Sequence, residues 1–204
     1  MPRVAGQIDV TKTAAILAAA GAVFSERGLS APIDAVARRA GVSKQTIYNR
    51  YRSKADLVRA LVTQRVEEAT APLFEPGALE HPEATLTAYG RFILDGYASG
   101  KSISMLRVTI EAAKDLPDVA RAVHEAGPQA SRRALAGYLA AEHAAGRMCV
   151  EDPLRAASFF SGMLVTSRQI DGLLGVDTAM SPEDADDLAR EVARRFIKAF
   201  APVP

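Results

Sequence analysis

The 204-residue sequence predicts an all-α protein of about nine helices. Strand-like alternation of β-branched residues is nearly absent, and apolar residues recur at helical spacing between short Gly, Pro and Ser segments. Four prolines stand where helices are expected to begin, and a missing backbone N–H costs little there: Pro82, Pro117, Pro153 and Pro182. The chain is long enough to bury a core of its own.

The first four helices have clear start and stop signals. Gly28 is expected to end the first helix, because glycine readily adopts the left-handed conformation that closes a helix. Ser43 is expected to cap the third helix, and Ser53 the fourth, where Ser53 and Asp56 fit the capping-box pattern. The expected ranges are about 10–27, 32–40, 43–50 and 53–73.

Longer helices are expected beyond Pro76. Their ranges are about 82–99, 102–114, 117–145, 153–174 and 182–201, with a break or kink at Gly127-Pro128. Neither an internal repeat nor a low-complexity linker divides the sequence. We predict an N-terminal domain over residues 1–54 and a C-terminal helical domain over residues 55–204, linked by the helix at 53–73.

Charge is segregated along the sequence, although the formal net charge is only +1. Residues 1–54 hold nine Lys or Arg and three Asp or Glu, giving +6, whereas residues 55–204 carry −5. The near-zero net charge argues against nucleic-acid binding, but the distribution of charge along the chain favours it, with the basic N-terminal end expected to face phosphate. A single cysteine, Cys149, needs no oxidising compartment, and no apolar run approaches the ~18 residues of a membrane span. A cytoplasmic location is therefore expected.

The most informative stretch is Asp34–Lys54, DAVARRAGVSKQTIYNRYRSK. Two short helices flank a turn at Gly41, and small Ala37 lets them approach, which is typical of a helix-turn-helix. A solvated amphipathic hairpin is the plain alternative. The second helix presents donors and acceptors for phosphates and base edges, namely Ser43, Lys44, Gln45, Thr46, Tyr48, Asn49 and Arg50.

This region resembles the DNA-binding domain of the TetR family of transcriptional regulators over about residues 9–62. The matching residues are Ile16, Ala19, Ala20, Phe24 to Gly28, Val36, Ala37, Ala40 to Lys44, Ile47, Tyr48, Tyr51, Ser53, Lys54 and Leu57. Their combined spacing is far more specific than a bare helix-turn-helix. Two departures stand out: Ala31-Pro32 replaces a frequent Thr pair, and Tyr51 replaces the usual Phe at an expected core position.

The resemblance implies that the helix beginning at Ser43 lies in the major groove. Tyr48 and Lys54 then occupy phosphate-contacting positions. Gln45, Thr46 and Asn49 are candidates for reading base edges, since Gln and Asn can pair bidentately with adenine. Arg50 stands where a His is common, and either a guanine or a phosphate suits its guanidinium. No catalytic residue, cofactor or metal site is expected.

The resemblance also implies a C-terminal domain that senses a small molecule of unknown identity and forms a homodimer through the helices at 153–174 and 182–201. The core-spaced residues of these helices suit either that interface or the chain's own core: Ala157, Phe160, Leu164, Val165, Leu188, Val192, Phe196 and Ala199. Arg107-Val108 precedes Glu111-Ala112, and Gly146-Arg147 precedes Asp152-Pro153; with these residues, about 103–166 weakly resembles the C-terminal region of the AefR-like subgroup. Seven further residues either line an effector pocket or belong to the plain core: Tyr89, Phe92, Ile93, Tyr97, Met105, Leu106 and Thr109.

Two other functions have some support in the sequence. The segment Gly96–Ser102 resembles a phosphate-binding P-loop, but Asp95 occupies the position of its first glycine, and a turn between helices explains the segment better. A helical scaffold without DNA activity leaves the basic helix-turn-helix unexplained. The sequence therefore predicts a homodimeric regulator, a repressor released from a palindromic operator by its effector.

Overall fold

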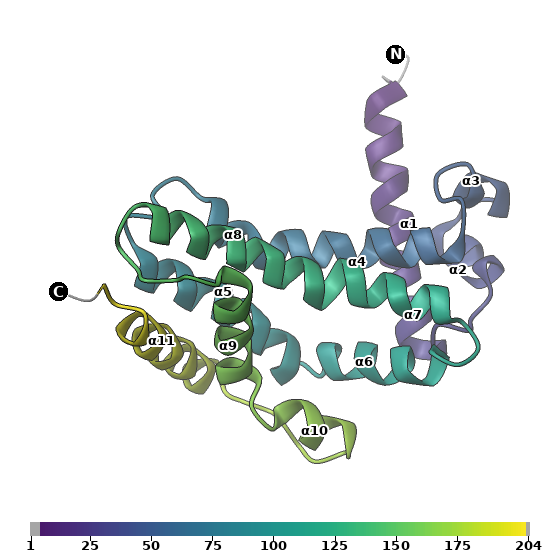
Figure 1. Cartoon of the computed structure of the whole chain (residues 1–204). Coiled ribbons are helices and arrows are strands. Elements are labelled where there is room, and N and C mark those ends of the chain that lie inside the picture. Colours follow the sequence, from purple (N-terminus) through teal and green to yellow (C-terminus); the bar gives the residue numbers. More distant parts are fainter. Residues whose placement is uncertain (1–4, 203–204) are drawn as a thin grey trace. The chain divides into compact units, whose positions relative to one another are not determined.

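The computed structural model describes the backbone of residues 5–202 and the side chains of residues 11–202. The first four residues of the predicted DNA-binding domain and the last two of the C-terminal domain lie outside this range. Helices make up the described chain, within which no strand forms, and this confirms the all-α prediction (Figure 1). No helix in this part of the chain is long and apolar enough to cross a bilayer.

The elements follow the predicted order closely. They are α1 (Ala5–Arg27), α2 (Ile33–Ala40), α3 (Lys44–Tyr48), α4 (Lys54–Thr70), the 3₁₀ helix η1 (Ala71–Phe74), α5 (Pro82–Ala98), α6 (Lys101–Ala112), α7 (Pro117–His124), the π-helical turn η2 (Glu125–Gln129), α8 (Ala130–Ala144), α9 (Pro153–Val165), α10 (Arg168–Leu173) and α11 (Pro182–Ala199).

Two long helices are interrupted. The kink predicted at Gly127-Pro128 is confirmed: Gly127 has non-helical angles, φ −94° and ψ −105°, between α7 and α8. The single helix predicted over 153–174 is wrong, because Thr166 lies at φ 49° and ψ −130° and separates α9 from α10. The break allows Gly172 of α10 to pack on Ile103, where an added Cβ would lie 2.7 Å from the isoleucine side chain.

Two compact units make up the chain. The first comprises the residues up to Arg65 together with Met105–Gly127. Its core gathers fully buried side chains of the N-terminal helices with apolar residues of α7: Ile16, Ala20, Phe24, Val36, Ile47, Leu57 and Val119 are at most 2% exposed. The sequence did not predict that α7 contributes to this core.

The second unit comprises Val66–Ser104 and the chain from Pro128 onward. In it α11, yellow in Figure 1, packs along α5, and α8 packs along α9. Aromatic rings join these helices: Phe160 lies 5.9 Å from Tyr89 and 5.2 Å from Phe196, centroid to centroid. Most of the core-spaced residues considered for a dimer interface are buried here inside the chain.

Candidate nucleic-acid interface

Helices α2 and α3 form the helix-turn-helix that the sequence predicts. Gly41 ends α2 in the left-handed conformation, φ 65° and ψ 31°, and its N–H donates to the carbonyl oxygens of Ala37 and Arg38. Ser43 then caps α3, since its Oγ accepts the N–H of Thr46 over 3.0 Å. A left-handed glycine followed by a hydroxyl cap is a stable way to turn the chain in so few residues. These two caps fix the turn.

One face of α3 is buried and the other is open. Ile47 is 1% exposed and packs in the core that also holds Val36 and Ala37 of α2. The residues expected to contact DNA gather on the remaining surface: Ser43, Lys44, Gln45, Tyr48 and Asn49 are exposed, whereas Thr46 and Arg50 are partly buried. The local fold therefore exposes five hydrogen-bonding side chains around α3.

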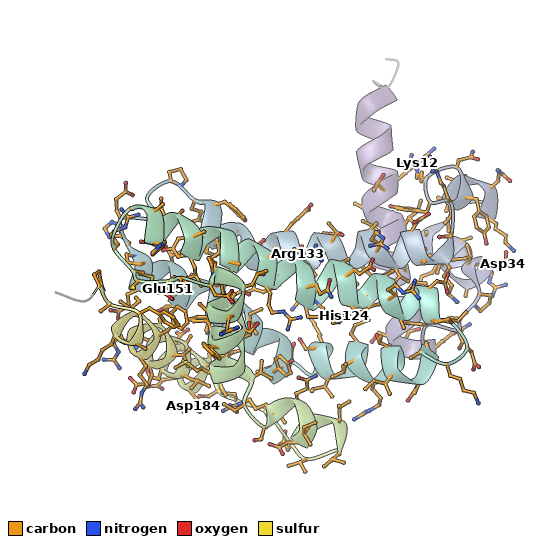
Figure 2. All side chains as sticks on the ribbon, in the orientation of Figure 1. Lys12, Asp34, His124, Arg133, Glu151 and Asp184 are labelled. Carbon is orange, nitrogen blue, oxygen red and sulfur yellow. The ribbon has the colours of Figure 1, made fainter. Side chains whose placement is uncertain are left out.

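Lys44 at the start of α3 is paired with an acidic residue of α2. Its Nζ lies 3.0 Å from Asp34 Oδ2, and both side chains are about half exposed (Asp34 is labelled in Figure 2). The hydrogen bond to Asp34, followed by the attraction between the two charges, raises the pKa of Lys44. The sequence did not predict this pair, because ten residues and a turn separate Asp34 from Lys44.

The two predicted base-reading amides are bonded to each other. Gln45 Nε2 donates to Asn49 Oδ1 over 2.9 Å, along one turn of helix. Residues four apart share a face of a helix, so their spacing alone was compatible with this contact. The two side chains therefore form one polar unit on the open face.

Arg50 and Lys54, the other two predicted DNA-contacting residues, bond to the body of the first unit. Arg50 donates from Nη1 to Thr13 Oγ1 of α1 over 2.8 Å. Lys54 donates from Nζ to the carbonyl oxygen of Ala31 over 2.6 Å, and partial burial lowers the pKa of its ammonium group. Neither partner was predicted, since both lie more than twenty residues away in the sequence.

Tyr51, the second departure from the family pattern, keeps its expected place. It is partly buried against the core of the first unit. Burial raises the pKa of its hydroxyl. Tyr51 therefore lies at the edge of this core, at the core position expected where the family usually has Phe.

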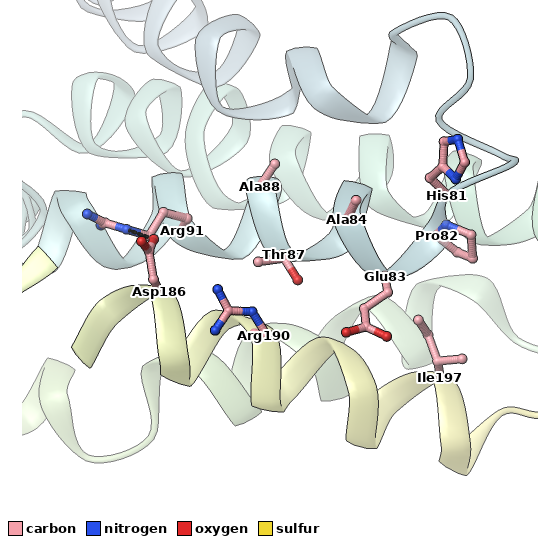
Figure 3. A pocket seen from close by; sticks show the side chains of 10 residues that line it. All are labelled: His81, Pro82, Glu83, Ala84, Thr87, Ala88, Arg91, Asp186, Arg190 and Ile197. Carbon is pink, nitrogen blue, oxygen red and sulfur yellow. Dashed lines mark hydrogen bonds and ion pairs between the residues drawn. The ribbon is translucent and has the colours of Figure 1, made fainter. Parts of the chain in front are cut away.

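A groove of about 760 Å³ runs between α5 and α11 of the second unit (Figure 3). Arg91 in this groove is held by Asp95 and Asp186, and the buried Thr87 hydroxyl has no hydrogen-bond partner among the described residues. The lining residues are His81, Pro82, Glu83, Ala84, Thr87, Ala88, Arg91, Asp186, Arg190 and Ile197. None of the seven residues considered for an effector pocket is among them. Tyr89, one of those seven, is buried in the core with its hydroxyl 2.8 Å from Ser131 Oγ.

The P-loop-like segment is a turn between helices. Its first residues complete α5, Gly100 turns the chain at φ 69°, and α6 begins at Lys101. This is the alternative that the sequence favoured. No strand precedes the segment in the described chain, whereas a P-loop follows a strand.

The all-helical fold and the basic helix-turn-helix define a class of protein, the DNA-binding transcriptional regulators. A family model described as bacterial regulatory proteins of the tetR family matches residues 16–61. A second model, the C-terminal domain of AefR-like transcriptional repressors, matches residues 84–202. The chain belongs to the TetR family, with an AefR-like C-terminal domain, and the resemblance drawn from its sequence is confirmed.

Solved structures agree with this assignment. The Flavonoid-responsive Regulator FrrA is 28% identical, with a TM-score of 0.72 over 95% of this chain and 99% of its own. A TetR-family regulator from Mesorhizobium loti is 22% identical, with a TM-score of 0.76 over 94% of this chain and 98% of its own. A TetR regulator from Agrobacterium tumefaciens, also 22% identical, has a TM-score of 0.74 over 94% of this chain and 95% of its own. The last two establish the fold. No curated protein matches the sequence.

Proposed function

We propose that this TetR-family regulator is a homodimeric repressor that leaves a palindromic operator when a small molecule binds its C-terminal domain. The observation that carries the proposal is the open face at α3, where five exposed hydrogen-bonding side chains lie on a helix anchored by buried Ile47. The match to AefR-like repressors over residues 84–202 supports repression. The similarity to FrrA, a flavonoid-responsive regulator, supports control by a small molecule.

The proposed binding roles of the two domains follow the distribution of charge along the sequence. Residues 1–54 carry +6 and would bind the operator, while residues 55–204 carry −5 and would bind the effector and the second subunit. Ser43, Lys44 and Tyr48 would contact phosphates, and Gln45, Thr46 and Asn49 would face base edges. Arg50 and Lys54 remain candidates for phosphate contact, although their bonds to Thr13 and Ala31 favour a role in positioning α3 and α4.

The dimer would form through the outer faces of α9 and α11. The inner faces are committed to the chain's own core, where Phe160 of α9 and Phe196 of α11 are buried. On the outside of α9, Leu154 is 56% and Phe159 is 55% exposed. Gly162, also exposed, has no atom within 4 Å of the position of a Cβ, so a second helix can approach closely there. A twofold dimer places two recognition helices on half-sites about 34 Å apart.

Repression would be relieved through a coupling free energy between two sites. Effector binding in the C-terminal domain would favour a dimer geometry in which the two α3 helices no longer match adjacent major grooves. Linkage requires that the effector weaken operator binding by the same factor by which the operator weakens effector binding. The coupling is therefore measurable from either side.

Footprinting of the DNA upstream of the protein's own gene tests the proposal. We expect a protected palindrome, with affinity that falls steeply between 50 and 200 mM salt as about 0.9 counterions are released per phosphate contact. Tyr48→Phe should weaken binding on all sequences, whereas Gln64→Ala, at an exposed position of α4, serves as the control. If no genomic fragment shows a sequence-specific footprint, the proposal is wrong.

A further inference from the structure

The hydrogen bond between Gln45 and Asn49 changes what each amide can offer to DNA. An unbonded Asn or Gln side chain has two N–H donors and a carbonyl acceptor, which is the combination that pairs with adenine N7 and N6. Here one N–H of Gln45 is donated to Asn49 Oδ1 over 2.9 Å. Both side chains are exposed, and they form no other hydrogen bond with the described side chains.

The bond leaves two different amides. Gln45 keeps one N–H and its whole carbonyl oxygen, so it still has the donor and acceptor that adenine requires. Asn49 keeps both N–H donors, but its oxygen already accepts from Gln45 with one of its two lone pairs and is directed toward that side chain. Its remaining character is that of a donor, which suits a base edge made of acceptors, such as guanine N7 and O6 or thymine O4.

We propose that Gln45 and Asn49 read two neighbouring base pairs as one hydrogen-bonded unit, Gln45 taking an adenine and Asn49 an acceptor-only edge, guanine or thymine. This inference rests on the proposed placement of α3 in the major groove. It replaces the expectation that each amide pairs with an adenine independently. It also assigns Asn49 a second role, because its oxygen holds the Gln45 amide in position for its base.

Base preferences measured on single and double variants test the coupling. Bound duplexes are selected from a pool with a randomised half-site, and the preferred sequence is then compared with point-substituted duplexes in competition assays. The proteins are the full-length wild type, Gln45→Ala, Asn49→Ala, the double variant, and Gln64→Ala as a glutamine control outside α3.

We expect each single variant to lose preference at both adjacent base pairs, by roughly tenfold at each. The double variant should bind the preferred duplex no more weakly than the weaker single variant, because either change already breaks the unit. Asn49→Asp keeps an acceptor for Gln45 but has no donor. It should therefore retain the preference for adenine and lose only the preference at the neighbouring base pair. Its added negative charge lowers the affinity for all sequences equally and does not affect this comparison.

The outcomes separate the two proposals. A wild-type chain that selects no sequence overturns the proposed function, and the paired readout with it. The coupling alone is overturned if the wild type selects a sequence but each single variant changes the preference at a different base pair. In that case the losses of affinity should multiply in the double variant. A preferred half-site that has adenine at neither of the two affected base pairs also overturns the paired readout. Circular dichroism of every variant verifies that it is folded.

Discussion

Lys54 Nζ donates to the carbonyl oxygen of Ala31 over 2.6 Å and lies 5.7 Å from the centroid of the Phe24 ring. The first residue of α4 is thereby joined to α1 and to the loop that precedes α2. An ammonium group over an aromatic face adds a cation–π attraction to the hydrogen bond. The side chain therefore links three segments of the first unit, and Ala31, which replaces a frequent Thr, takes part through its backbone.

A positioning role for Lys54 predicts a loss of stability without a change in the number of phosphate contacts. Lys54→Met should lower the free energy of unfolding by about 1–3 kcal/mol, because the buried Ala31 carbonyl loses its charged donor. Operator affinity should fall, but the slope of log affinity against log salt should stay constant. Urea unfolding and fluorescence anisotropy at several salt concentrations measure the two quantities.

The matched control for Lys54 is Lys114→Met, which removes an exposed lysine of the same unit. It should leave both stability and affinity close to wild type. If Lys54→Met is as stable as this control and its salt slope is shallower by about 0.9, then Lys54 contacts a phosphate and the positioning role is wrong.

Asp34 is predicted to restrain DNA binding through Lys44. The 3.0 Å pair neutralises a basic residue at the start of α3. Asp34→Asn should strengthen binding to random-sequence duplex and steepen its salt slope by up to about 0.9, because Lys44 becomes available to one more phosphate. Stability should change by less than about 1 kcal/mol, since the pair is half exposed. Asp118→Asn, in the first turn of α7, is the control; weaker binding by Asp34→Asn would contradict the prediction.

The helix-turn-helix was predictable because its signals are local. The conformation of Gly41 and the cap at Ser43 depend on residues within five positions, and the buried positions repeat at helical spacing. The Ser53 cap is of the same kind, with Asp56 N–H donating to Ser53 Oγ over 3.1 Å. Propensity and capping therefore fix these elements before any tertiary contact is considered.

What the sequence did not predict depends on distant contacts. The partners of Arg50 and Lys54 lie 37 and 23 residues away, so no spacing rule could place them. The break at Thr166 was missed for a similar reason. A β-branched residue rarely adopts positive φ, and the contact made beyond the break, Gly172 on Ile103, joins residues that are distant in the sequence. The apolar stripe of α9 and α11 suited an interface and a core equally until its burial was known.

Arg147 is predicted to be essential for stability because it holds a buried carboxylate. Glu142 of α8 is 0% exposed; its Oε2 accepts from Arg147 Nε over 2.7 Å, and its Oε1 has no partner among the described residues. Arg147→Met should cost about 3 kcal/mol or more in urea unfolding, because the charge then stays buried without a counterion. The double variant Glu142→Leu/Arg147→Met should recover most of that loss.

The control for Arg147 is Arg155→Met, which breaks an exposed pair with Asp152 and should cost less than about 1 kcal/mol. Equal stabilities of Arg147→Met and Arg155→Met would show that the Glu142 charge does not need its partner.

Alkaline pH should destabilise the second unit through Tyr138. Burial, and next the neighbouring Glu142 carboxylate, raise the pKa of the Tyr138 hydroxyl, which donates to the Ala78 carbonyl oxygen. The unfolded chain releases this proton near pH 10 and the folded chain retains it, so the stability is complete below pH 10 and falls as the pH rises further. Tyr138→Phe should flatten this fall while costing about 1 kcal/mol at neutral pH. Urea unfolding at pH 7–11 measures this stability. If stability falls equally steeply with pH in Tyr138→Phe and in the exposed control Tyr48→Phe, the prediction is wrong.

The outer face of α9 is predicted to hold the dimer together. Phe159 is 55% exposed beside Gly162, and burying this ring against a second copy would remove a large apolar side chain from water. Phe159→Glu should shift the sedimentation coefficient from dimer to monomer and weaken operator binding at least tenfold, since a monomer holds only one half-site. Ile110→Glu charges a residue of similar exposure, 56%, on α6 and should remain dimeric. Dimeric Phe159→Glu that still binds the operator would place the interface elsewhere on the molecule.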